Sequence, residues 1–248
     1  MTTTAPSNKW FVRPLPNDGA ETRIFLFPYV GGGPAVYGKW PAEFGSHIET
    51  FIAHYPGRGS RYNEPPIHQA EPLVEEIAQA IQPYLDKSFA FFGHSFGGLI
   101  AYELAKQIQP QVLFISGCAA PHLTNPHPQI HHLSDSEFIK VLQERNAVPD
   151  EIAGNAEVME LFSPMLRADF EAFENYRPNK HQLNCPIIAF GGIDDPSVSR
   201  ERLESWSTHT TAKFRSRYFP GDHFFINASK ADVIASISSE LTPTHAER

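Results

Sequence analysis

Short runs of apolar residues recur along the chain and indicate strands. The runs cover residues 24–29, 51–55, 89–93, 112–116, 186–191 and 214–219. Four of these runs are continuous rather than alternating. Strands that are apolar on both faces are typical of a parallel sheet covered by helices on each side. We therefore predict a mostly parallel sheet built from these segments.

Helical spacing of apolar residues appears between these runs. The segments 71–85, 98–108 and 230–241 each place apolar side chains three or four positions apart, which predicts amphipathic helices. Strand and helix thus alternate along the chain, as in a doubly wound α/β fold. We expect residues 1–248 to form a single domain of this class.

One stretch, residues 121–180, breaks the alternation because it contains no convincing strand. A capping box from Ser134 to Glu137 begins one predicted helix, and a second helical pattern covers 158–173, interrupted at Pro164. Open α/β sheets bind ligands beyond the carboxyl ends of their strands. We interpret the stretch as a helical lid insertion over those ends. Two ordinary crossover helices are the alternative.

Composition and charge exclude several classes of protein. The net charge is −8, and neither a basic block nor a nucleic-acid-reading motif occurs, so no nucleic-acid partner is expected. No run of about 18 apolar residues is present, and the N-terminus lacks an apolar signal segment. The two cysteines, Cys118 and Cys185, do not form a disulfide framework and are interpreted as small core residues. We expect a cytoplasmic protein with no membrane partner.

The clearest chemical signal is the segment Gly93-His94-Ser95-Phe96-Gly97. It matches the pattern G-x-S-x-G, follows a predicted strand and opens a predicted helix, which is the context that this nucleophile motif requires. The serine must sit on a sharp turn, where glycines on either side avoid a collision of Cβ atoms. The helix directs N–H groups and a positive dipole at an anion formed beside the serine. We predict that Ser95 is a nucleophile.

A serine nucleophile needs a histidine base, which comes last in the chain in this strand–turn–helix context. His223 lies directly after the last apolar run and before the last helix, so we expect it at the same sheet edge as Ser95. His209 and His245 lie in polar segments and are weaker candidates. His94 adjoins the serine, but adjacent side chains on such a turn diverge.

The acid that orients the histidine should follow another strand at this edge. The run 186–191 leads into Asp194 and Asp195, whereas the segment after 112–116 holds no carboxylate. Asp195 stands three residues after Gly192, a spacing that lets a turn swing the carboxylate back toward the histidine. We predict Asp195 as the acid, with Asp194 as the alternative.

The oxyanion of an acyl transfer needs two preorganised N–H donors. The amide of Phe96, directly after the nucleophile, supplies one. The glycine-rich segment at 27–37, FPYVGGGPAVY, should supply the other, and we predict Val30, with Gly31 as the alternative. A phosphate-binding loop is not indicated, because neither G-x-G-x-x-G nor a P-loop lysine is present.

A metal site is not predicted, although four histidines gather in one part of the proposed lid. The segment PHLTNPHPQIHH contains His122, His127, His131 and His132 but no acidic or cysteine ligand. We interpret this proline-rich segment as the entrance to the lid.

Five segments together resemble the type II thioesterases of polyketide and nonribosomal peptide synthesis, members of the α/β-hydrolase superfamily. They are FPYVGGG, YPGRGSR (55–61), GHSFGG, GGIDDP and GDHFF. Their order matches from about residue 22 to 240, and general lipases and esterases rarely carry YPGR at this place. The chain departs from the family at Tyr29 and Val30, where histidine or phenylalanine and then alanine often follow the proline.

The resemblance implies a triad of Ser95, Asp195 and His223 with oxyanion amides from Val30 and Phe96. It implies hydrolysis of acyl, aminoacyl or peptidyl thioesters on the phosphopantetheine arm of an acyl or peptidyl carrier protein, without a cofactor. It also implies an editing role, the removal of stalled groups. A cytosolic carboxylesterase acting on small esters is the alternative, and the intact triad disfavours a noncatalytic binding module. We expect a monomer.

Two expectations concern side chains around the proposed site. Arg58 and Arg61 in YPGRGSR have no derived catalytic role, and we expect them to stabilise their loop rather than to contact a carrier protein. The apolar faces of the lid helices should line an acyl chamber. We expect Met165 and Phe173 from the lid, and Tyr29 from the glycine-rich loop, to line it.

Overall fold

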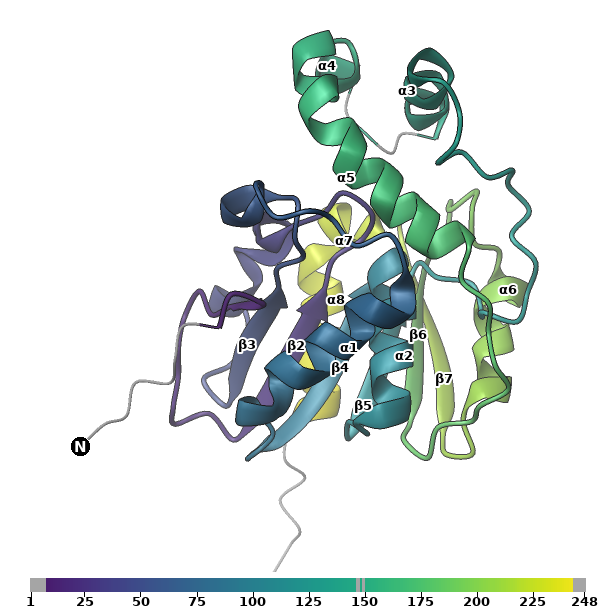
Figure 1. Ribbon diagram of the computed structural model, residues 1–248. Helices are drawn as coiled ribbons and strands as arrows, with labels where there is room; N and C mark the ends of the chain where they lie inside the picture. Colours follow the sequence, from purple (N-terminus) through teal and green to yellow (C-terminus); the bar gives the residue numbers. More distant parts are fainter. Residues whose placement is uncertain (1–7, 146–147, 149, 243–248) are drawn as a thin grey trace, which may run out of the picture.

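A seven-stranded sheet forms the centre of the molecule, with the strand order β1-β3-β2-β4-β5-β6-β7 (Figure 1). The computed structural model describes residues 8–145, 148 and 150–242. The strands are β1 (Phe11–Val12), β2 (Thr22–Phe27), β3 (Ile48–Ala53), β4 (Ser88–His94), β5 (Val112–Ser116), β6 (Ile187–Gly192) and β7 (Phe214–Phe219). All neighbouring strands are parallel except β1 and β3. The predicted mostly parallel sheet is confirmed.

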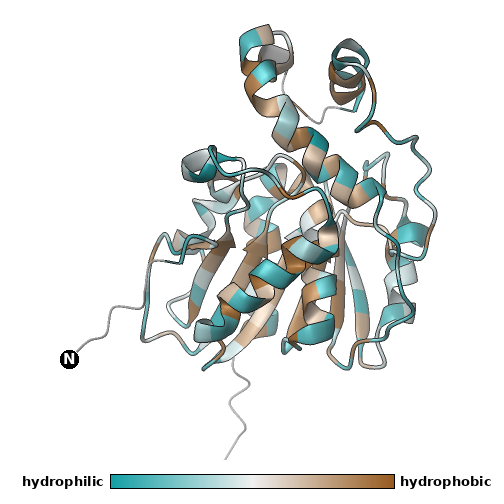
Figure 2. Ribbon diagram, viewed as in Figure 1, coloured by the Kyte–Doolittle hydropathy of each residue, from teal (hydrophilic) through white to brown (hydrophobic). Residues whose placement is uncertain are grey.

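Helices cover both faces of the sheet, which explains why its central strands are apolar on both sides. Successive residues of β2 alternate between two buried clusters, with Phe25 and Phe27 in one and Ile24 and Leu26 in the other. The first cluster includes residues of α1 (Ala70–Ile81), α2 (Phe96–Gln107) and α6 (Arg200–Glu204). The second includes residues of α7 (Phe225–Ala228) and α8 (Lys230–Leu241). Figure 2 shows the strands mostly in the colours of hydrophobic residues.

Short 3-10 helices occupy several connections. They are η1 (Pro34–Tyr37), η2 (Trp40–Ala42), η3 (Gly59–Arg61), η4 (Gln82–Tyr84) and η5 (Ser205–His209). The helix predicted over 71–85 therefore ends at Ile81, and η4 follows it, with Pro83 inside this tighter turn. Within the described ranges, no helix is both long and apolar enough to cross a bilayer.

Three helices follow β5 in the 121–180 segment: α3 (Asp135–Glu144), α4 (Asp150–Ala153) and α5 (Ala156–Glu174). No strand occurs in the described part of this segment. The predicted capping box begins α3, where the Ser134 N–H donates to the Glu137 carboxylate at 3.2 Å. Side chains from this segment form a buried cluster of their own. Figure 1 shows α5 crossing above the carboxyl ends of the strands, with α3 and α4 farther out.

The interruption expected at Pro164 is wrong, because α5 runs through this residue without a break. Proline removes one N–H donor and crowds the preceding turn. Here the helix continues because it packs against the protein both before and after the proline. Met159 is buried before Pro164, and Leu166 and Ala168 are buried after it. Tertiary packing thus overrides the local preference.

The two edges of the sheet differ from its centre. β1 has only two residues, too few to give a recognisable pattern, and the sequence analysis did not predict it. At the other edge, β7 alternates between more and less exposed residues. Arg215 and Arg217 are half-exposed on this strand, and both pair with Glu240 of α8.

Candidate active site

Ser95 occupies the sharp turn between β4 and α2, with φ 53° and ψ −119°. Among the described residues, it alone combines a side chain with a positive φ. A Cβ atom at Gly93 would lie 2.0 Å from the Gly97 carbonyl oxygen, and one at Gly97 would lie 2.0 Å from the Phe27 carbonyl oxygen. Only glycine fits at either place, and the tight packing of these glycines holds the serine in its strained backbone conformation.

His223 and Asp195 come together from two loops at the same sheet edge. The His223 Nδ1 lies 2.9 Å from the Asp195 Oδ2. The Asp195 side chain is fully buried, and its Oδ1 accepts from the backbone N–H groups of Ser197 at 2.7 Å and Val198 at 3.2 Å. The alternative acid, Asp194, is exposed. The structure thus brings Asp195, rather than Asp194, to the histidine.

Gly192 explains how these loops can meet. A Cβ atom at this position would lie 2.2 Å from the Asp222 carbonyl oxygen, so the loop after β7 passes directly over the end of β6. Asp222 itself accepts from the Phe224 N–H at 2.8 Å and stays local. The glycine of the G-x-x-D segment is therefore needed for steric reasons, because no side chain fits where the two loops meet.

A cavity of about 560 Å³ lies beside Ser95 and His223, which both line it. Its volume lies within the range of about 300–1,000 Å³ that is usual for small-molecule sites. Among the residues expected to line a substrate chamber, Tyr29 and Phe173 contribute to the wall.

The expectation for Met165 is wrong, because this side chain does not line the cavity. It is buried in the cluster of the 121–180 segment, together with Ile130 and Phe138. The next residue, Leu166, lines the cavity, as does Phe170 one turn later. Helical periodicity predicted an apolar stripe, but the stripe contacts two different neighbours, and sequence alone does not divide it between them.

The glycine-rich segment forms a tight turn beside the serine. The Gly32 N–H donates to the Tyr29 carbonyl at 2.8 Å, and the Gly31 N–H donates to the Asp169 carboxylate at 2.8 Å. The second donor considered for the oxyanion, Gly31, is therefore already engaged. Val30 lines the cavity. Phe96 is the first residue of α2, so its N–H has no partner within the helix.

His94 packs beneath His223, a contact that was not predicted from the sequence. Its ring is fully buried, with its centroid 5.2 Å from that of His223, and its Nδ1 lies 2.9 Å from the Ser116 hydroxyl. Burial, together with the nearby His223, holds the pKa of His94 well below its usual range. It does not line the cavity, as expected for a residue that diverges from Ser95.

His209, His122 and His131 make side-chain contacts within the fold. His209, expected in a polar segment, is buried, and its Nε2 lies 2.7 Å from the Nδ1 of His122 at the cavity wall. Burial and the neighbouring His122 lower the pKa of His209 to about 4. The His131 Nδ1 lies 2.6 Å from the buried Glu174 carboxylate. In the described ranges, no three potential ligands gather in a way that could hold a metal ion. His245 lies outside the described residues.

Arg58 and Arg61 are both buried, but the hydrogen bonds of Arg61 stay within its own loop, whereas those of Arg58 reach a distant segment. Arg61 donates to the His54 carbonyl at 2.5 Å and to the Glu64 carboxylate at 2.7 Å. Arg58 makes two parallel bonds of 2.7 Å to Asp169 of α5. The expected structural role fits both contacts, but the contact of Arg58 with the 121–180 segment was not foreseen.

The two cysteines are free and buried, as expected for core residues. Cys118 packs beside Gly98, where an added Cβ would lie 3.1 Å from the Cys118 Cβ, and it also lines the cavity. Burial raises the pKa of the Cys118 thiol to about 12, so it stays protonated and is not a competing nucleophile.

Comparison with known proteins places the chain in a family. The family model of the thioesterase domain matches residues 22–241. The gramicidin S biosynthesis protein GrsT of Aneurinibacillus migulanus is 38% identical over 248 residues, which cover 97% of each chain. Thioesterase PikA5 of Streptomyces venezuelae is 30% identical over 247 residues, covering 96% of this chain and 87% of PikA5.

The solved structures agree with these relatives. The type II thioesterase BorB from the borrelidin biosynthetic cluster superimposes with a TM-score of 0.86 at 27% identity, over 96% of this chain and 99% of BorB. The match covers both the sheet and the 121–180 segment, so the architecture is that of the α/β-hydrolases. The chain therefore belongs to the thioesterase family and is a serine hydrolase that acts on thioesters.

Proposed function

We propose that the protein hydrolyses acyl, aminoacyl or peptidyl groups from the phosphopantetheine arms of carrier proteins and so clears stalled assembly lines. The observation that carries this proposal is the contact of His223 with the buried Asp195 at the wall of a cavity that also contains Ser95. Relatives named for gramicidin S and borrelidin biosynthesis support a substrate bound to a carrier protein.

Acylation would begin at Ser95, which lies where its hydroxyl can reach a thioester carbonyl in the cavity. The Nδ1 of His223 faces Asp195, which leaves Nε2 to accept the serine proton. As the Oγ–carbon bond forms, the carbonyl oxygen becomes an oxyanion, which would accept from the N–H groups of Val30 and Phe96. The carbon–sulfur bond then breaks, and the imidazolium returns its proton to the leaving thiolate.

Deacylation would repeat these steps with water as the nucleophile. His223 takes a proton from the water, whose oxygen attacks the acyl-serine carbonyl, and the same two N–H groups stabilise the second oxyanion. The carbon–Oγ bond breaks, Ser95 regains its proton and a free carboxylic acid leaves. Asp195 stabilises the imidazolium in both halves of the reaction, because its buried carboxylate is fixed by two backbone N–H groups.

The 121–180 segment would act as a lid over this chemistry. The cavity wall includes the proline-containing stretch 121–127 and apolar side chains of α5, among them Leu166 and Phe173. A long pantetheine arm and an apolar acyl chain need a covered channel that still opens to a protein-sized partner, and lids of this kind move on microsecond-to-millisecond timescales.

The test is a hydrolysis panel with the same acyl groups loaded on carrier proteins, on N-acetylcysteamine and as ethyl esters. We expect the highest kcat/KM for the carrier-bound thioesters and a loss of about 10⁴-fold or more for Ser95→Ala. Faster turnover of the free esters would instead favour the alternative, a small-ester carboxylesterase. Activity of Ser95→Ala within tenfold of the native enzyme would contradict the serine mechanism.

A further inference from the structure

Hydrogen bonds fix four backbone groups of the turn Tyr29–Gly32, which carries Val30. The Tyr29 carbonyl accepts from the Gly32 N–H, the Gly31 N–H donates to Asp169, and the Gly32 carbonyl accepts from Arg58 at 3.0 Å. Gly31 has φ +74°, the left-handed value that the third position of a type II turn requires. Within the described residues, the Val30 N–H has no hydrogen-bond partner in the protein.

The direction of the Val30 N–H follows from these bonds. It shares one planar trans peptide unit with the Tyr29 carbonyl, so the two groups point in opposite directions. Because the Tyr29 carbonyl points into the turn, the Val30 N–H points out of it. Val30 lines the cavity that also contains Ser95. The orientation of the predicted oxyanion donor therefore depends on whatever holds the turn.

Arg58 and Asp169 hold the turn from outside. Both side chains are almost completely buried, with 6% and 3% of their surfaces exposed, and their two parallel bonds are 2.7 Å long. Asp169 also accepts from the Gly31 N–H, and Arg58 also donates to the Gly32 carbonyl. The pair thus joins the YPGR loop, the glycine-rich turn and helix α5.

Helix α5 reaches the turn through a second contact one helical turn earlier. A Cβ atom at Gly31 would lie 2.5 Å from the Leu166 Cδ2, so this side chain packs directly on the turn. Leu166 and Asp169 are three residues apart and share one face of α5. Any movement of α5 away from the sheet edge would break both contacts.

We propose that Arg58 and Asp169 are positioning residues that hold the Tyr29–Gly32 turn, so that the Val30 N–H is aimed at the oxyanion only while α5 is docked. The lid helix would then complete the site for charge stabilisation as well as cover it. The inference deepens the proposed function, because it assigns a catalytic consequence to the position of the lid.

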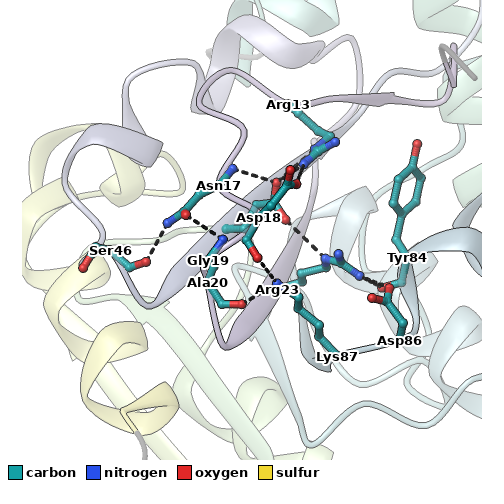
Figure 3. Close-up of polar contacts among 11 residues, drawn as sticks. Arg13, Asn17, Asp18, Gly19, Ala20, Arg23, Ser46, Tyr84, Asp86 and Lys87 are labelled. Atoms are coloured by element: carbon teal, nitrogen blue, oxygen red, sulfur yellow. Dashed lines mark hydrogen bonds and ion pairs between the residues drawn. The ribbon is translucent and has the colours of Figure 1, made fainter. Parts of the chain in front are cut away.

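A second buried ion pair provides a matched control. Arg23 and Glu49 start β2 and β3, at the amino ends of the strands and far from the serine, and their side chains are 9% and 0% exposed. The Arg23 Nε lies 3.2 Å from Glu49, and Figure 3 shows the network of polar contacts around Arg13 and Arg23. This pair resembles the first in burial, although one bond of 3.2 Å joins it instead of two of 2.7 Å, and it does not contact the glycine-rich turn.

The experiment compares three double variants with the native enzyme. Arg58→Met/Asp169→Leu removes both charges and the acceptor of the Gly31 N–H, whereas Arg58→Met/Asp169→Asn keeps an acceptor. Arg23→Met/Glu49→Leu is the control. Replacing both partners of a buried pair by apolar groups avoids leaving one of the pair as an isolated buried charge, which is strongly destabilising. In the control, Arg13 and Asp86 also lose a partner, but their side chains are 25% and 63% exposed. For each we would measure Tm, and kcat and KM with an acyl-N-acetylcysteamine or, if that is not turned over, an ethyl ester.

A third measurement separates positioning from structure. With an acyl trifluoromethyl ketone, the serine Oγ would attack the ketone carbon and its proton would move to His223, so that an oxyanion forms in the site. The matching thioether binds without reacting. We expect Arg58→Met/Asp169→Leu to lower kcat and the affinity for the ketone by the same factor, about 10- to 100-fold. We expect KM and the affinity for the thioether to change less than about threefold, and the Asn variant to lose less than the Leu variant.

The proposal is overturned if the Leu variant keeps its kcat and its affinity for the ketone, or if the control variant loses both to the same degree at a similar Tm. If the Leu variant does not fold, Arg58→Lys replaces it, since lysine keeps the charge but cannot make the parallel bonds. We expect Arg58→Lys to lose kcat at unchanged KM. The readouts apply to thioester or ester, so a failure of the carrier-protein proposal would not be mistaken for a failure of this one.

Discussion

Asp194 and Asp195 are neighbours in the chain, yet their carboxylates lie in opposite environments. Asp195 is buried and accepts two backbone N–H bonds besides its contact with His223, whereas Asp194 is exposed to solvent. A buried carboxylate held in this way can fix the histidine tautomer. The difference between the two residues gives a direct test of the triad.

We expect Asp195→Asn to lower kcat by about 10³- to 10⁴-fold, because the amide would favour the wrong tautomer of His223. Asp194→Asn should leave kcat within about twofold, as is usual for surface substitutions away from special features. Steady-state kinetics of both variants with one thioester would decide the matter. The reverse ranking would assign the acid to Asp194.

At the scale of elements, α5 faces two ways. Met165 packs inside the 121–180 segment, while Phe173 lines the cavity, with its ring centroid 6.3 Å from that of Phe96. The helix therefore stabilises the segment with one part of its surface and bounds the chamber with another. Substitutions on the two sides should have separable effects.

We expect Met165→Ala to cost about 2–5 kcal/mol of stability, because the side chain is fully enclosed. The ratio of kcat/KM between a long and a short acyl chain should not change. Phe173→Ala should enlarge the chamber and raise that ratio by about tenfold or more, because even one methylene in an apolar pocket changes selectivity by about that factor. Thermal melts beside kinetics with two chain lengths check both statements. An altered ratio of kcat/KM in the Met165 variant would show that Met165 contacts the acyl chain after all.

The elements were predictable where a short-range pattern determines them. Six of the seven strands follow from apolar runs, and the capping box located the start of α3. The pattern failed for β1, which is too short, and at Pro164, where packing keeps the helix intact. The order serine, acid, histidine led to Ser95, Asp195 and His223, and the structure brings the last two into contact beside the cavity that Ser95 lines. The Arg58–Asp169 pair was not predictable, because 111 residues separate its partners and no sequence motif contains both.

At the scale of the whole molecule, buried neutral histidines make the fold sensitive to acid. Burial lowers the pKa of His209 to about 4 and holds that of His94 well below its usual range. An unfolded chain would titrate both near 6.5. Between these values the unfolded state binds more protons than the folded state, so stability decreases as the pH falls.

We expect the free energy of unfolding to decrease as the pH is lowered from about 6.5 toward 4, by about 1.4 kcal/mol per pH unit for each such histidine. His209→Gln should flatten this slope by the contribution of one group. Urea titrations at several pH values in this window, for both proteins, measure the slopes. Identical slopes would show that His209 is charged in the folded state.

The two edges of the sheet affect the tendency of the protein to aggregate at high concentration. An unpaired strand edge is a template for intermolecular β-pairing, which leads to aggregation. Here the two-residue β1 pairs with β3 at one edge. At the other edge, β7 carries the charged side chains Arg215 and Arg217, which disfavour pairing with another strand. Neither edge offers a long, flat, uncharged ladder to a second copy. If the protein acts on carrier proteins as proposed, protected edges would keep its own sheets from joining while it binds these partners.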